Sequence, residues 1–304
     1  MRFRAEIAED ICEMKKSKRF FTILILLFVL AFAALVIGAL FNFFGEQPEN
    51  EQEETAPELT ETEEPPPIET DDIDDEELVV LSRFTDYMEQ NEDLVGWIRV
   101  PNTAINFPVV YCSDNAFYLN HDFLKRPAGA GTPFLDMDAG ILENNQSLSI
   151  YAHYSTTFTA LHEYKKLEYY KEYPLFEFST LYEDGFYKIF SVFYMAGNSS
   201  DKLFYYYPVS HFSSDAAFMK HVDELRARSI FTTAVDVNPE DQLLLMTCCT
   251  YETNNLRLIV AGRKIRPGES IIVDTEAAHV NPEPLYPQKW YDAKGGNPPD
   301  LTDS

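Results

Sequence analysis

An uninterrupted apolar run near the N-terminus constrains this chain more than any other feature. Residues 20–41 are 22 consecutive residues without a charged side chain. As a helix rising about 1.5 Å per residue, this run spans roughly 33 Å, enough to cross the hydrocarbon core of a bilayer. A cleaved signal peptide is the alternative, but its apolar core is only about 7–15 residues long, and no small-residue cleavage site follows Phe41. The sequence therefore predicts an uncleaved transmembrane signal-anchor over residues 20–44.

Charged residues on either side of this run predict its orientation. Six basic side chains precede it: Arg2, Arg4, Lys15, Lys16, Lys18 and Arg19. The flank that follows it contains acidic side chains and no Lys or Arg up to Glu77. Basic flanks stay in the cytoplasm. We therefore expect a single-pass cell-membrane protein with residues 1–19 in the cytoplasm and the chain beyond about residue 45 outside the cell.

Residues 45–76 are predicted to form a disordered linker. The stretch from Glu46 to Glu77 holds 16 of the 50 acidic residues, together with three consecutive prolines at 65–67. Like charges and prolines keep such a chain extended, and it has too few apolar side chains to bury. We expect it to act as a solvated spacer between the membrane and an outer domain.

The composition also excludes two classes of protein. The formal net charge is −26, which argues against nucleic-acid binding, because recognition of phosphate requires a positive surface. Four cysteines are present, at positions 12, 112, 248 and 249. Their number and spacing fit neither a disulfide framework nor a structural zinc site.

Residues 77–268 form the predicted outer domain. The spacing of apolar residues predicts a helix over 77–90, and serines at its start can cap a second helix over about 213–228. Seven segments separated by turn residues have the composition of strands: 95–100, 105–111, 148–152, 185–194, 232–237, 242–247 and 256–265. Many short strands without alternating helices favour a closed or sandwiched β fold. The proline-rich tail, residues 269–304, is expected to wrap this domain or to be mobile.

Side chains suited to acyl transfer stand at the ends of predicted strands. The apolar strand 242–247 leads into Cys248 and Cys249, and Arg257 opens the strand that follows, while His153 ends an earlier strand. A thiol nucleophile, an imidazole that moves protons and a cation for the oxyanion make a complete acyl-transfer site. Each of these residues alone is more often structural than catalytic. A single cysteine at a strand end, for example, is usually a core residue, because cysteine is among the most buried residue types. Their combination in an extracytoplasmic domain indicates a candidate active site.

The sequence around these residues resembles the sortase family. Residues 245–248 read Leu-Met-Thr-Cys and are followed by Arg257, which resembles the T-L-x-T-C…R signature of sortases. Further segments resemble class B sortases: 94–98 (LVGWI), 106–110 (NFPVV), 118–123 (YLNHDF), 134–136 (FLD) and 150–153 (IYAH). The aromatic stretch 169–178 and the predicted second helix also fit this class. The resemblance covers about residues 77–268.

This resemblance implies an eight-stranded sortase β-barrel with an N-terminal helix and one inserted helix. It also implies a membrane-anchored cysteine transpeptidase of a Gram-positive-type bacterium, which cuts a sorting signal near the C-terminus of secreted proteins. The acyl half is held as a thioester and passes to an amine of a peptidoglycan precursor or a pilin. Carried over by position, Cys248 is the nucleophile, His153 the general acid/base and Arg257 the oxyanion stabiliser. These roles require no metal or organic cofactor, although some sortases respond to calcium.

The double cysteine leaves the nucleophile open between two neighbours. Cys248 keeps Thr247 immediately before it and places Arg257 nine residues later, whereas Cys249 places Arg257 eight residues later and matches Cys-Thr-Tyr-Glu. Neighbouring residues of a strand face opposite ways, so only one thiol can reach a shared cleft. We expect Cys248 to be the nucleophile, with Cys249 as its rival.

Two other functions and several other side chains remain as alternatives. A thiol hydrolase or protease would share the first half-reaction, and a catalytically silent, membrane-tethered binding module would keep only the barrel. Asp136 and Asp138 could position His153. We expect His121 to be a structural hydrogen-bonding residue rather than a catalyst.

Overall fold

The computed structural model describes residues 79–139, 145–153, 157–197, 199–201, 203–204, 208–250, 252 and 255–298. The chain divides into two units, Met1–Ile73 and Asp74–Ser304, and every described residue belongs to the second. The predicted cytoplasmic segment, signal-anchor and linker lie outside the described residues. Within the described part, none of the helices has the length and apolarity needed to cross a membrane.

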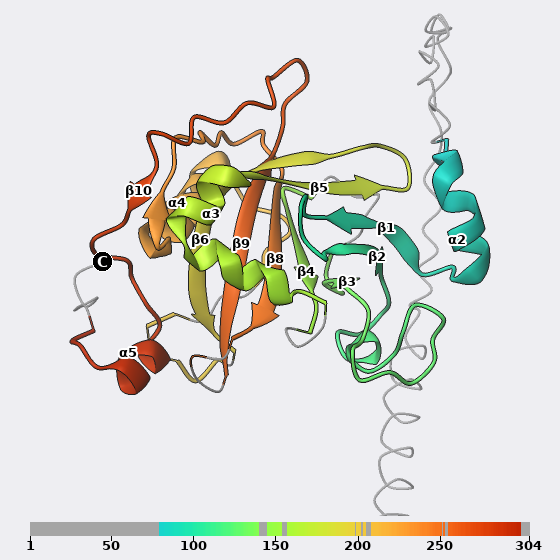
Figure 1. Ribbon diagram of the computed structural model, residues 1–304, viewed down its shortest axis with the longest axis horizontal. Coiled ribbons are helices and arrows are strands. Elements are labelled where there is room, and N and C mark those ends of the chain that lie inside the picture. Colours follow the sequence, from blue (N-terminus) through green and yellow to red (C-terminus); the bar gives the residue numbers. More distant parts are fainter. Residues whose placement is uncertain are drawn as a thin grey trace, which may run out of the picture. The chain divides into compact units, whose positions relative to one another are not determined.

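Eight strands of the described residues close into a barrel (Figure 1), which confirms the predicted mainly β, eight-stranded fold. Around the barrel the order is β1-β2-β3-β4-β8-β9-β6-β5. The strands are β1 (Leu94–Arg99), β2 (Asn106–Val110), β3 (Phe134–Leu135), β4 (Ser147–Tyr151), β5 (Leu175–Thr180), β6 (Phe186–Ala196), β8 (Leu243–Cys249) and β9 (Leu256–Lys264). The pairs β2–β3 and β4–β8 are parallel, and the other neighbours for which pairing is described are antiparallel.

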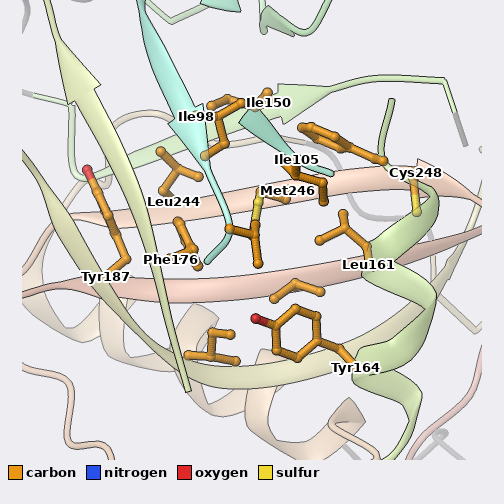
Figure 2. Close-up of a cluster of buried hydrophobic side chains, with 14 of the residues drawn as sticks. Ile98, Ile105, Ile150, Leu161, Tyr164, Phe176, Tyr187, Leu244, Met246 and Cys248 are labelled. Atoms are coloured by element: carbon orange, nitrogen blue, oxygen red, sulfur yellow. The ribbon is translucent and has the colours of Figure 1, made fainter. Parts of the chain in front are cut away.

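Strand β8 is buried on both of its faces. Leu244 and Met246 point into the barrel and join the buried cluster drawn in Figure 2. Leu243 and Leu245 point outward and pack in a second buried cluster with the apolar stripe of helix α4 (Asp215–Arg228). A strand covered on both faces reads as a continuous apolar run rather than an alternating one, as residues 243–246 do.

The helices agree in part with the prediction. The N-terminal helix is shorter than expected and consists of a 3₁₀ turn, η1 (Ser82–Phe84), followed by α2 (Thr85–Gln90). The inserted helix α4 begins as predicted, because the Ser214 hydroxyl accepts a hydrogen bond from the backbone N–H of Ala217 at 3.2 Å. The sequence analysis missed four short elements: η2 (Phe117–Leu119), η3 (Thr159–Lys165), α3 (Leu167–Glu172) and α5 (Gln288–Lys294).

One predicted strand was wrong in extent and place, and two barrel strands were missed. Of the segment 232–237, only its first residue is extended, in β7 (Phe231–Thr232), which pairs with β10 (His279–Val280) in a separate two-stranded sheet. Val235 and Val237 instead pack in the outer cluster beside α4, so their apolar character reflects burial rather than pairing. Strand β3 has only two residues, too few to show a period, and β5 lies within an aromatic-rich stretch.

The segment after β9 packs against the domain through aromatic rings and backbone hydrogen bonds. Tyr286 and Trp290 stack with ring centroids 4.3 Å apart, and Trp290 lies 4.7 Å from the ring of Tyr194 on β6. The Asp201 carboxylate accepts the backbone N–H groups of Gln288 at 3.0 Å and Lys289 at 2.9 Å. Helix α5 is thereby fastened to the connection between β6 and α4.

A buried ionic cluster lies at the C-terminal end of β9. The Arg263 guanidinium is fully buried; its Nη2 donates to Glu269 Oε1 at 2.8 Å, and its Nε donates to the Asp236 carbonyl at 3.2 Å. Lys188 Nζ lies 2.6 Å from the same Glu269 oxygen. The hydrogen bonds from Arg263 hold the pKa of Glu269 well below its ordinary value, although burial opposes this. Glu269 therefore balances two cations that are shielded from water.

Candidate active site

The predicted site residues meet at one end of the barrel because of the strand directions. Strands β4 and β8 are parallel, with Tyr151 opposite Thr247, so their C-terminal ends lie at the same edge. His153 and Cys249 each lie two residues beyond that pair. Strand β9 runs antiparallel to β8 and places Arg257 directly opposite Cys249.

A cavity of about 440 Å³ opens at this edge. His153, both cysteines and Arg257 contribute to its wall. Its other lining residues are Asn115, Leu119, Phe134, Asp136, Met137, Asp138, Tyr151, Ala152, Pro208 and Thr247. The structure thus brings together the histidine, the two rival cysteines and the arginine that the sequence pattern selected.

The alternation of side chains separates the two cysteines. Cys248 pairs with Leu258 across β9, and both belong to the cluster inside the barrel. Cys249 lies four residues after Leu245 on the same strand, so its side chain points to the same outer side as Leu245, which packs toward α4. The residue opposite Cys249 on β9 is Arg257. The cysteines therefore face opposite sides of the sheet, as strand geometry requires.

His153 follows the end of β4 and lines the same cavity as Cys249. Ile150 and Ala152 of the β4 segment belong to the interior cluster. The alternate position of β4, Tyr151, then belongs to the outer side, and the strand ends at this residue. Cys249 and Arg257 share the outer face of the sheet and Cys248 points to the inner face, while His153 lines the cavity beside them.

The surroundings of Cys248 disfavour its thiolate. Its side chain is 1% exposed and lies among the buried residues of Figure 2, which include Leu161 of η3. Burial, with a smaller contribution from the neighbouring Cys249, raises the pKa of the Cys248 thiol to about 12. Cys249 is half-buried and lies opposite a guanidinium. The geometry favours Cys249 as the nucleophile. The sequence had predicted Cys248 in this role.

The carboxylate of Asp136, beside the cavity, holds the segment that follows β3. Asp136 is buried; one of its oxygens accepts from Asn115 Nδ2 at 3.1 Å and the other from the backbone N–H of Asp138 at 3.0 Å. His121 Nδ1 lies 2.7 Å from the Phe117 carbonyl, and its ring stacks on Phe117 at 4.0 Å. These contacts agree with the structural role expected for His121.

Sequence reasoning missed one histidine next to the candidate nucleophile. His162 Nε2 lies 3.2 Å from the Cys249 carbonyl oxygen and 3.9 Å from Cys248 Sγ. Burial, and next the charge of Lys165, lower the pKa of His162 below its ordinary value. Residue 162 lies 87 positions before Cys249 in a short 3₁₀ helix, so no local pattern connects the two.

Proteins similar to this chain in sequence are sortases of class B. No protein-family model matches the chain. Sortase B of Staphylococcus aureus is 26% identical over 192 residues, which cover 62% of this chain and 76% of that protein. Sortase B of Listeria monocytogenes is 24% identical over 191 residues, covering 61% of this chain and 75% of that protein.

Solved structures similar to this fold belong to the same class. A structure of sortase B from Bacillus anthracis has a TM-score of 0.56 at 25% identity and covers 62% of this chain and 86% of that chain. A Staphylococcus aureus sortase B–substrate complex has a TM-score of 0.55 at 26% identity, with the same coverage of both chains. At the level of the family, these relatives support a sortase-type cysteine transpeptidase. They confirm the resemblance of this chain to class B sortases that its motifs and its barrel indicate.

Proposed function

We propose that this protein cleaves a C-terminal sorting signal of secreted proteins and transfers the acyl group to an amine. The amine would belong to a peptidoglycan precursor or a pilin. The observation that carries the proposal is one cavity lined by His153, Cys249 and Arg257, with Arg257 directly opposite Cys249. We assign Cys249 as the nucleophile, His153 as the general acid/base and Arg257 as the oxyanion stabiliser.

The chemistry follows from these positions. His153 accepts the proton of the Cys249 thiol, and the thiolate attacks the scissile carbonyl carbon. The negative charge that develops on the carbonyl oxygen is stabilised by Arg257 from the adjacent strand. Directly opposite residues of an antiparallel pair have Cβ atoms about 5 Å apart, so one carbonyl group can contact both side chains. His153 then protonates the leaving amine, which leaves a thioester on Cys249. An acceptor amine, deprotonated by His153, displaces the thiol and forms the new amide.

The burial of Cys248 supports the choice of its neighbour. A thiol is nucleophilic as its thiolate, and a pKa of about 12 leaves Cys248 almost wholly protonated near neutral pH. Its side chain also belongs to the interior cluster, away from the face that carries Arg257. The role of Cys248 in this proposal is packing.

The test is to trap the acyl-enzyme in single cysteine variants. The probe is a sorting-signal peptide from a secreted protein of the same genome, and the readout is intact-protein mass spectrometry with peptide mapping. We expect an adduct in the wild type and in Cys248→Ala, and none in Cys249→Ala. An adduct that persists in Cys249→Ala and vanishes in Cys248→Ala would refute the nucleophile assignment.

The product distinguishes transfer from the alternatives. With an amine acceptor present, a transpeptidase yields the amide and a hydrolase yields the free acid. A binding module without catalysis yields no adduct in the wild type. His153→Ala should lose both the adduct and the product while the protein stays folded.

We also propose that the enzyme is anchored in the cell membrane by residues 20–44, with the catalytic domain outside. The support is the apolar run and the basic side chains that precede it. A reporter enzyme that is active only in the cytoplasm, fused after Gly45, should be inactive. Activity of that reporter would reverse the proposed orientation.

A further inference from the structure

His162 is a buried histidine that contacts the backbone of the candidate nucleophile and that the proposed chemistry does not use. It lies on η3, is 9% exposed, and its Nε2 is 3.2 Å from the carbonyl oxygen of Cys249. The same nitrogen is 3.9 Å from Cys248 Sγ. One imidazole therefore contacts both cysteines, from inside the domain.

The partner atom determines the state of this imidazole. A backbone carbonyl only accepts hydrogen bonds, so Nε2 carries a hydrogen and donates it to Cys249. Burial disfavours the imidazolium, and the ammonium of Lys165 adds to this, so the pKa of His162 is lowered while Glu252 and Glu163 act weakly the other way. Near neutral pH His162 is a neutral donor through Nε2.

The carbonyl that His162 contacts belongs to the last residue of β8. On the β9 side, Cys249 is held opposite Arg257, and the N–H of Thr250 donates to the Leu256 carbonyl at 3.0 Å. The hydrogen bond from His162 holds the same peptide from the η3 side. Fixing this peptide fixes the direction of the Cys249 Cα–Cβ bond relative to Arg257.

A second contact ties the same two segments together. Lys165 of η3 forms an ion pair with Glu252, three residues beyond Cys249, at 2.7 Å. The segment that leads into η3 also starts at His153, whose carbonyl accepts the N–H of Phe158 at 3.2 Å. Residues 157–165 therefore contact both the backbone of the proposed general acid/base and the peptide of the proposed nucleophile.

From these contacts we propose that His162 is a positioning residue, which donates a hydrogen bond to the Cys249 carbonyl and so holds the thiol in register with His153 and Arg257. The inference rests on the proposed role of Cys249. His162 itself exchanges no proton with the substrate. A small displacement of a reacting group costs rate far more than it costs binding.

The test compares three substitutions of His162 in the full chain. His162→Gln retains an N–H donor at the length of Nε2, His162→Asn carries the same amide on a shorter side chain, and His162→Leu removes the donor. The measurements are kcat, KM, Tm and the pH profile of kcat/KM with the sorting-signal peptide. We expect His162→Leu and His162→Asn to lower kcat about tenfold with KM within about twofold, as loss of one hydrogen bond worth about 1.4 kcal/mol implies. His162→Gln should stay within about threefold of the wild type, with the acid limb of its pH profile unmoved.

His221 on α4 provides the matched control. It is a half-buried histidine outside the cavity wall, and His221→Leu should leave kcat unchanged. Equal kcat in His162→Leu and the wild type would overturn the inference. A kcat of His162→Gln lowered as far as that of His162→Leu, with a displaced acid limb, would also overturn it, because His162 would then transfer protons. If His162→Leu fails to fold, the comparison of Gln with Asn decides.

The two proposals fail in different ways. A thioester that survives in Cys249→Ala would overturn the nucleophile assignment and this inference with it. Loss of the thioester in Cys249→Ala, together with full kcat in His162→Leu, would overturn only the role of His162.

Discussion

The two adjacent thiols should differ in reactivity by orders of magnitude, although they are neighbours in sequence. The pKa of about 12 for Cys248 corresponds to a thiolate fraction of about 10⁻⁴ at pH 8. An ordinary cysteine with a pKa of about 8.5 is roughly one quarter thiolate at that pH. Burial should therefore reduce the alkylation rate of Cys248 on the order of 10³-fold through ionisation alone, and further through steric exclusion.

The assay is a time course of iodoacetamide labelling followed by peptide mapping. A Cys12→Ser, Cys112→Ser background leaves only the two thiols of interest. We expect rapid labelling of Cys249 in the folded protein and almost none of Cys248. In concentrated urea, where the burial is lost, the two rates should converge.

A single outcome would refute this reasoning. If Cys248 in the folded protein is labelled within about tenfold of its rate in urea, it is not shielded by the interior cluster. The assignment of the Cys248 side chain to the barrel interior would then fail as well. Slow labelling of Cys248 that rises about tenfold per pH unit between pH 7 and 9 would support it.

Three further predictions concern the site, the ionic cluster and the C-terminal segment. Arg257→Ala should lower the rate of acyl-enzyme formation by roughly 10²–10³ in single-turnover kinetics. Arg257→Lys should also be impaired, because lysine lacks the planar guanidinium with its paired N–H donors. A turnover of Arg257→Ala near that of the wild type would show that Arg257 has no role in the site. In urea denaturation, Glu269→Gln should lower the free energy of unfolding by about 3 kcal/mol, because Glu269 balances two buried cations, whereas the exposed Glu183→Gln should cost less than about 1 kcal/mol. Because the pKa of Glu269 is lowered on folding, its contribution should be complete above its unfolded value of 4.5 and shrink as the pH falls further; a difference between the wild type and Glu269→Gln that grows in acid would contradict this. Trp290→Ala should cost about 2 kcal/mol of stability by removing the stacked rings at α5, and an unchanged Tm would show that the segment adds nothing to the domain.

Much of the fold and the candidate site could be predicted from local sequence patterns. The apolar strands and the capped helix at Ser214 follow from periodicity and from the preference of a hydroxyl for a helix N-terminus. The positions of His153 and Arg257 at strand ends could also be predicted, because a short β-type segment precedes His153 and an apolar run follows Arg257. Strand β3, with two residues, and the segment 232–237 were not, because neither has a period that separates pairing from burial.

The face on which each cysteine lies was decided only by the tertiary structure. In a strand with one solvent-exposed face, polar residues would mark the outer side. They would then show to which side Cys248 and Cys249 each point. Strand β8 has no such marker, because the barrel interior covers one face and α4 covers the other. The contact of His162 with Cys249 spans 87 residues and depends on where η3 packs after the barrel closes. A sequence can place a thiol at a strand end, but packing on both faces decides which thiol meets the arginine.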